Sequence, residues 1–175
     1  MRRAALLLAP ALALAASPAR ASELFVGLLA HDVDTPLSKG GLEDGLDIAF
    51  GWRGDRIRAL GLIGAPSPYA FVAAATAGRT HVAAAGLSWR LGGRLFARPG
   101  IGFAIHSRSS RGAVNGVRTD LGSRLLFEPE LGIGYQVDER IAIEATWVHV
   151  SHAQLLSRQN PGMDSIGVRL TFKLR

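Results

Sequence analysis

Cysteine is absent from the 175 residues of this chain. A disulfide framework, a zinc–thiolate site and a cysteine nucleophile are therefore excluded. Charged residues are scarce, at 19% of the sequence. Beyond the N-terminal leader, no uninterrupted apolar run reaches the roughly 18 residues that a membrane-spanning helix needs. The composition thus argues against both a disulfide-stapled domain and a bundle of transmembrane helices.

The excess of basic over acidic residues is small. The formal net charge is +6, but Arg2, Arg3 and Arg20 lie in the leader, which holds no acid, so the remainder carries only +3. No basic run alternates with aromatic residues in the way that a nucleic-acid-binding groove needs. Nucleic acid is therefore not expected as a partner.

The first 21 residues have the pattern of a secretory signal peptide. A basic start, Met1-Arg2-Arg3, precedes a run rich in Leu and Ala over residues 4–16, and Ala19-Arg20-Ala21 supplies small residues before Ser22. This arrangement is typical of an exported protein, and the apolar run is too short for a membrane anchor. We expect residues 1–21 to be removed and residues 22–175 to form a single domain.

Beyond the leader, apolar residues recur with a period of two, which indicates β-strands. The clearest case is 166–174, where Ile, Val, Leu, Phe and Leu alternate with Gly, Arg, Thr and Lys. The third segment is interrupted by Pro66 and Pro68, which cannot donate to a strand ladder. The pattern predicts eight strands, near residues 24–32, 43–53, 57–75, 80–91, 94–106, 121–137, 140–151 and 163–174.

The connections favour a membrane barrel. Tight turns are expected at 53–56, 92–93 and 138–139, and longer polar loops at 33–42, 107–120 and 152–162. Together with export, this predicts an all-β fold, an eight-stranded antiparallel transmembrane β-barrel of the outer membrane, with an apolar face toward lipid. Glu128, Glu130, Glu144 and Arg169 would then pair inside. The alternative is a soluble exported β-sandwich or a lipocalin-like barrel.

Three polar residues stand out near the predicted outer rim of the last hairpin. On the seventh predicted strand, His149 and Ser151 are expected to point to the same face as Trp147, which is the lipid side. On the eighth, Asp164 is expected to point to the same side as Ile166. Adjacent antiparallel strands bring such residues side by side. Polar groups that face lipid are unfavourable unless they pair with one another, so their clustering indicates a functional site.

Serine, histidine and an acid together can carry out acyl transfer to water. Ser151 would be the nucleophile, His149 the base that removes its proton, and Asp164 the acid that orients the imidazole. Asn160 and Gly162 are candidates for the oxyanion site and for substrate binding. The alternative is that His149 and Ser151 are solvated residues of the rim.

The segment HVSHAQLLSRQNPGMDSIGVRL resembles the C-terminal signature of the PagL-type lipid A 3-O-deacylases. That signature reads His-x-Ser-Asn-Ala, a short loop, Asn-x-Gly and then an acid. Weaker similarity extends through AAAGLSWRLGGRLFARPGIGFAIHS and LLFEPELGIGYQVDERIAIE. The resemblance implies an outer-membrane serine esterase that hydrolyses the 3-O-linked hydroxyacyl ester of lipid A, with lipopolysaccharide as its substrate and membrane lipids around it.

Carried over by position, the resemblance makes His149 the base, Ser151 the nucleophile and Asp164 the acid, which is often Glu in the family. Asn160 matches the loop asparagine that helps form the oxyanion hole. His152 departs from the family pattern, which has Asn there. No metal or other cofactor is implied, and the sequence leaves open whether the chain forms a homodimer.

Other interpretations remain beside this one. A noncatalytic small outer-membrane barrel, structural or adhesive, would place the same residues at its rim, and an outer-membrane phospholipase would use a different His-Ser context. His31, Asp32 and Asp34 suggest either a metal site or, as we favour, a solvated extracellular loop.

Overall fold

The computed structural model describes residues 21–38, 41–77, 80–107, 120–152, 155 and 161–174. Within these residues the chain forms nine strands and one 3-10 helix, with little else that is regular. The strands are β1 (Ala21–Ala30), β2 (Leu46–Gly54), β3 (Ser67–Ala75), β4 (Val82–Ser88), β5 (Leu91–Gly92), β6 (Leu95–His106), β7 (Leu125–Gln136), β8 (Ile141–Val150) and β9 (Met163–Lys173). The helix is η2 (Arg58–Ile63). Residues 1–20 of the predicted leader lie outside the described part.

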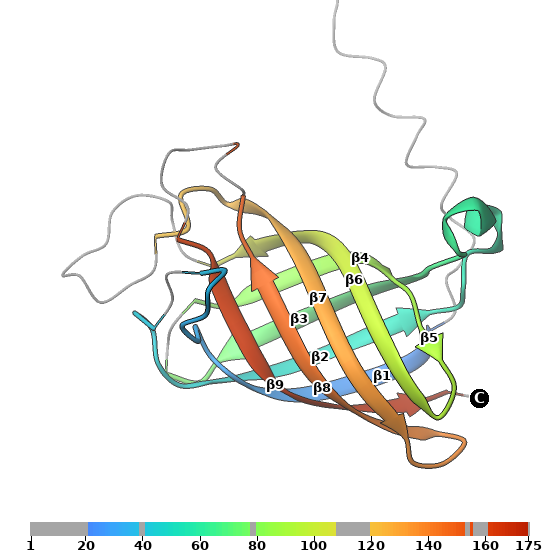
Figure 1. The fold of residues 1–175 in the computed structure, drawn as a ribbon. Helices are drawn as coiled ribbons and strands as arrows, with labels where there is room; N and C mark the ends of the chain where they lie inside the picture. The colour runs from blue at the N-terminus through green and yellow to red at the C-terminus, as the bar shows by residue number, and fades with distance from the viewer. Residues whose placement is uncertain are drawn as a thin grey trace, which may run out of the picture.

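The strands close into a barrel (Figure 1). Every pairing is antiparallel; β1 pairs with both β2 and β9, and β4 pairs with β6. β5 continues the ladder of β4 along β6, because Ser88 lies opposite Gly100 and Leu91 opposite Ala97. The barrel is therefore eight-stranded, as the alternation predicts, and the pairing of β4 with β6 closes it.

The segment expected as one strand over 57–75 is different in the structure. Strand β3 begins only at Ser67, and residues 58–63 form η2. Gly64, with φ of 89°, ends the helix in the left-handed region, and Pro66 follows it at the entrance to the strand. The tight turn predicted at 53–56 is accordingly wrong, because the chain between β2 and β3 runs from residue 55 to residue 66.

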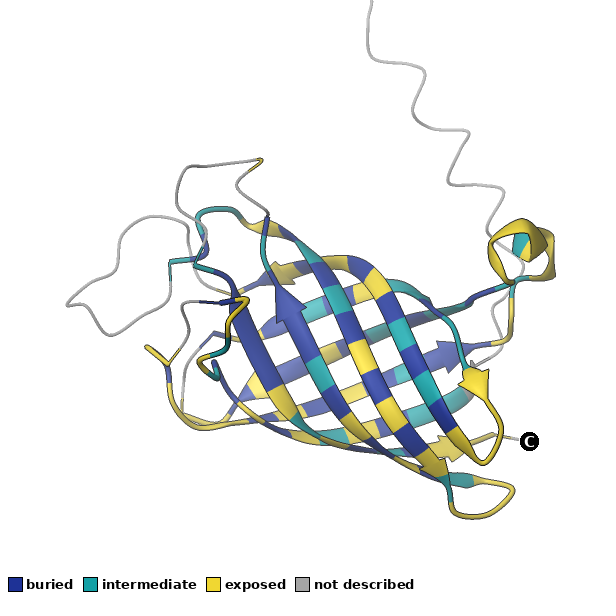
Figure 2. Ribbon diagram, viewed as in Figure 1, coloured by how far each residue is buried: buried dark blue, intermediate teal, exposed yellow. Residues whose placement is uncertain are grey.

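The two faces of each strand differ in the way that the alternation predicts. Along β6 and β7, buried residues alternate with exposed or half-buried ones (Figure 2). The exposed positions carry large apolar side chains, among them Phe50, Phe103, Ile133 and Val168. A continuous apolar outer surface of this kind is what a barrel presents to lipid rather than to water. Among the residues that the structure describes, no helix is long and apolar enough to span a membrane.

The barrel interior holds a buried network of charges, as predicted. Arg169 Nη1 donates to Glu130 Oε2 at 2.6 Å, and Arg98 Nε donates to Glu144 Oε2 at 3.1 Å. Glu128 is fully buried and accepts a hydrogen bond from the Tyr69 hydroxyl. Buried charges are stable only when they are paired and hydrogen-bonded, so the network fills the lumen and fixes the strands that carry it.

The two ends of the barrel carry different connections. We call the end with the connections after β1, β3, β6 and β8 the loop end, and the opposite end, with those after β2, β5 and β7, the turn end. Strand β9 begins at the loop end and runs to the C-terminus at the turn end (Figure 1). His149, Ser151 and Asp164 all lie at the loop end, where β8 finishes and β9 starts.

Candidate active site

The last hairpin brings a histidine and an acid into direct contact. His149 on β8 lies opposite Asp164 on β9 in the strand register. The His149 Nδ1 atom is 2.7 Å from Asp164 Oδ1, within a buried pair. Because a carboxylate only accepts hydrogen bonds, Nδ1 carries the proton in this contact, so Nε2 is the ring nitrogen that could act as a base. This is the orientation that a general base needs.

The carboxylate of Asp164 has further donors on both oxygens. The indole Nε1–H of Trp147 donates to Oδ1 at 2.9 Å, and the hydroxyl of Thr35 donates to Oδ2. The Trp147 ring also stacks on the His149 ring, with centroids 5.9 Å apart and planes 24° from parallel. Asp164 is 0% exposed, so these contacts both satisfy its charge and fix its orientation.

The pair lies on the outward side of the wall, beneath a loop. The ladder between β8 and β9 is continuous from Ile141 to Val150, so His149 shares the face of Ile143, as the alternation predicts. His149 is nevertheless only 8% exposed. Residues 33–38 fold over it; Val33 N donates to Asp164 O at 2.7 Å. The loop thus shields from lipid a pair that the strand register alone would expose.

Ser151 directly follows Val150, the last residue of β8, and lies two residues beyond His149. It forms an isolated bridge with Phe127 on β7, donating its backbone N–H to the Phe127 carbonyl at 3.1 Å and accepting in return at 2.7 Å. Its side chain is half-buried. Among the described residues, no hydrogen bond joins the Ser151 hydroxyl to the His149 ring. Such contacts are often long before substrate binds, so the arrangement is compatible with a nucleophile and its base.

Gly162 borders the free side of the histidine ring. A Cβ atom at this position would lie 2.9 Å from His149 Cε1 and 3.5 Å from Nε2, and the residue adopts a φ of +69°. Both the space and the backbone conformation require glycine here. Gly162 is therefore placed beside Nε2 of His149. Asn160, the other predicted oxyanion residue, lies outside the described residues.

His152, the departure from the family pattern, is fully buried at 0% exposure. It follows Ser151 in the chain and has the parity of Val148 and Val150, which are both buried. Its burial places it within the protein at the end of β8, and no catalytic role is assigned to it.

Another buried histidine lies at the start of the covering loop, the loop that includes residues 33–38. His31 Nδ1 is 2.8 Å from Asp47 Oδ1, and its Nε2 is 3.1 Å from Glu43 Oε2. Thr80 donates to Glu43 through both its N–H and its hydroxyl, and Ser165 donates to Asp47 at 2.9 Å. The cluster thus joins His31, at the start of the β1–β2 loop, and Glu43, near its end, to Ser165, the residue after Asp164.

This cluster shifts the pKa values of its members. Burial opposes protonation of His31, but its hydrogen bonds to Asp47 and Glu43 outweigh burial and raise its pKa to about 9. Burial likewise opposes ionisation of Glu43, but hydrogen bonds from His31 and Thr80 lower its pKa to about 2. His31 is therefore a cation held between two carboxylates at neutral pH.

The prediction that His31 and Asp32 belong to a solvated loop is wrong. They are 4% and 1% exposed, because the loop folds inward onto the barrel end. In the described part of the chain, no group of three or more His, Asp or Glu side chains is arranged to hold a metal ion.

Sequence reasoning also missed two partners of the acid. Thr35 is 129 residues away from Asp164 and belongs to a loop without periodicity, so no local pattern points to it. Trp147 did carry a signal, because it shares the parity of His149, and a half-buried indole needs an acceptor for its N–H.

Comparisons with known proteins agree with this geometry. The family model described as "Lipid A 3-O-deacylase (PagL)" matches residues 49–173. The structure described as "Crystal structure of the outer membrane enzyme PagL" superposes with a TM-score of 0.64 at 20% sequence identity. That alignment covers 87% of this chain and 99% of the other. No curated protein matches the chain in a sequence comparison.

The family match includes β8, β9 and the His149–Asp164 pair, and the structural match shows that the barrel fold is the same. The same family therefore matches both the barrel fold and the segment that carries the histidine–carboxylate pair. The chain belongs to the PagL family of lipid A 3-O-deacylases, which are outer-membrane enzymes.

Proposed function

We propose that this chain is a serine esterase that removes the 3-O-linked hydroxyacyl chain of lipid A in the outer leaflet of the outer membrane. The observation that carries the proposal is the His149–Asp164 pair at 2.7 Å, on the outward face of the wall and two residues from Ser151. A substrate held in the leaflet reaches such a site by lateral diffusion, without leaving the membrane. The proposal includes export through residues 1–21 and a loop end that faces the cell exterior.

The reaction has two steps. Ser151 Oγ attacks the ester carbonyl carbon while His149 Nε2 takes the hydroxyl proton. The tetrahedral intermediate then collapses, the bond to the sugar oxygen breaks, and His149 returns the proton to that oxygen. Water attacks the acyl-enzyme by the same route, and a 3-hydroxy fatty acid leaves.

Each supporting residue has a defined part in these steps. Asp164 stabilises the imidazolium that forms when His149 takes the proton, and Trp147 and Thr35 act as positioning residues that hold the carboxylate. Donors for the oxyanion are proposed to come from Asn160 and the backbone at Gly162. The chemistry needs only protein side chains and water, so no cofactor is proposed.

The test is the lipid A of a Gram-negative host. Expression of the wild type should remove one 3-hydroxyacyl chain, seen by mass spectrometry, and expression of Ser151→Ala should not. Ser67→Ala, a half-buried serine at the turn end, is the matched control and should behave as the wild type.

Three results would contradict parts of the proposal. Unchanged lipid A with folded wild type would leave the noncatalytic barrel as the better interpretation. Release of fatty acid from phospholipids instead would favour the phospholipase. Deacylation that persists in Ser151→Ala would exclude Ser151 as the nucleophile.

A further inference from the structure

The connection between β2 and β3 at the turn end is a folded unit that exposes apolar residues. Helix η2 has no buried residue; Leu62 is 104% exposed and Ile63 is 54% exposed. The unit is nevertheless well defined, because Arg56 donates to the carbonyls of Ala65 at 2.9 Å and Gly64 at 2.7 Å. A loop that is held in shape while it exposes a leucine and an isoleucine suits an apolar environment outside the protein.

One side chain places η2 on the outer side of the barrel. The indole Nε1–H of Trp89 donates to the Ile63 carbonyl at 2.6 Å. Trp89 continues the β4 ladder through its N–H to Pro99 O at 2.9 Å, and its neighbour Ser88 is buried on the inner side. Alternation therefore turns Trp89 outward, and the end of η2 packs on the outer face of the wall rather than over the lumen.

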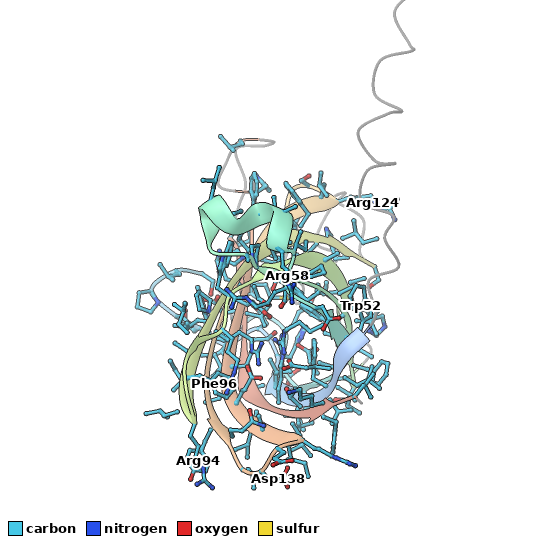
Figure 3. The ribbon with its side chains drawn as sticks, turned by 90° about the vertical axis from the view of Figure 1, so that its right-hand side faces the viewer. Trp52, Arg58, Arg94, Phe96, Arg124 and Asp138 are labelled. Carbon is cyan, nitrogen blue, oxygen red and sulfur yellow. The ribbon has the colours of Figure 1, made fainter. Side chains whose placement is uncertain are left out.

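The views of the barrel agree with this placement. Figure 3 looks at the turn end, and η2 lies there toward one side of the rim. In Figure 1 the same helix lies beyond the strand ends at the turn end, at the upper right of the view. Gly64 also lies close to the Trp89 ring, since a Cβ there would be 3.2 Å from Cδ1.

The outward face at this level is the border of the apolar belt. Trp52 ends the outward row of β2, whose preceding members Ile48 and Phe50 are exposed, and Leu91 and Leu95 are exposed beyond Trp89. Tryptophan is enriched where a membrane barrel meets the lipid headgroups. The end of η2 thus lies beside the border of the apolar belt.

We infer that η2 is an interfacial anchor, whose Leu62 and Ile63 insert among the phospholipids of the leaflet at the turn end. Short segments with exposed apolar residues bind at the boundary between headgroups and acyl chains in this way. The anchor continues the lipid contact of the barrel and lies at the end opposite His149, so it is separate from the proposed chemistry.

The absence of cysteine makes a direct test possible, because one introduced cysteine takes one label. Leu62→Cys is labelled with an environment-sensitive fluorophore and refolded into phosphatidylcholine vesicles that contain a headgroup-proximal nitroxide lipid. Glu139→Cys, exposed in the β7–β8 turn at the same end, is the aqueous control, and Phe103→Cys is the control within the belt. β-sheet circular dichroism and heat-modifiable gel mobility check that each variant folds.

The label at 62 should emit at shorter wavelength than that at 139. It should also be quenched by the nitroxide lipid and be several-fold less sensitive to aqueous iodide. If it instead matches the label at 139 in both measurements, the inference is wrong. Ile63→Cys repeats the test at a second position, so the result stands if the first variant does not fold. Deacylase activity does not enter either measurement, and failure of the proposed function leaves this test unaffected.

Discussion

Replacing Thr35 with valine tests whether the loop over residues 33–38 positions Asp164, the proposed orienting acid. Valine keeps the shape of threonine but removes the hydroxyl that donates to Asp164 Oδ2. A hydrogen bond to a charged group contributes about 1.5–3 kcal/mol. If that contribution is fully expressed when the imidazolium forms, kcat falls by roughly 10- to 150-fold, because each 1.36 kcal/mol is a factor of ten.

The loss should appear in kcat rather than in KM. Thr35 contacts the acid on the side away from His149 Nε2, so it does not touch the acyl chain in the proposed reaction. The assay measures release of 3-hydroxy fatty acid from purified lipid A in detergent micelles at several substrate concentrations. Thr35→Ser keeps the hydroxyl and should stay within a few-fold of the wild-type rate.

Two outcomes would refute the reasoning. Equal rates for the valine and serine variants would show that the hydroxyl does not position the acid. A loss confined to KM would show that the loop contacts substrate instead. Heat-modifiable gel mobility in both variants separates these outcomes from misfolding.

The remaining predictions concern other contacts of the same end. Trp147→Phe keeps the ring but removes its donor to the acid, so kcat should fall roughly tenfold, measured in the same assay; a wild-type rate would exclude the role. Gly162→Ala should slow the reaction far more than Gly41→Ala, whose glycine also has a positive φ but only an ordinary contact nearby; equal effects would point to backbone strain alone. His31 should stabilise the barrel fully below pH 6.5 and lose this contribution as pH rises through its pKa of about 9, at most about 3 kcal/mol. Chemical unfolding at pH 6 and pH 10 measures this, and a slope that persists in His31→Gln would refute it.

Much of the fold could be predicted because strand alternation is a local property. One parity decides the face of every residue on a strand, so Trp147, His149 and Asp164 could be assigned to the same side of the wall from the sequence alone. The interior charges follow by the same rule, since Glu144 and Arg169 have the parity opposite to the belt. Counting alternating segments then gives the eight strands of the barrel.

What could not be predicted depends on contacts between distant segments. Residues 58–63 contain leucine and isoleucine that suit a strand, and only the contact of their end with Trp89, 26 residues on, shows where they lie. Thr35 and His31 belong to a loop that takes its shape from the barrel it folds against. Their burial is a property of the assembled end, and no period in the sequence encodes it.

The covering loop also explains how a carboxylate is kept on the lipid side of a membrane barrel. A charge facing lipid is unfavourable unless it is paired, and Asp164 has donors on both oxygens before any substrate is present. With residues 33–38 above it, the acid meets neither lipid nor water. Nε2 of His149 lies beside it, next to Gly162. In the proposed reaction, with this loop over the acid, the ester approaches His149 from the side of Ser151.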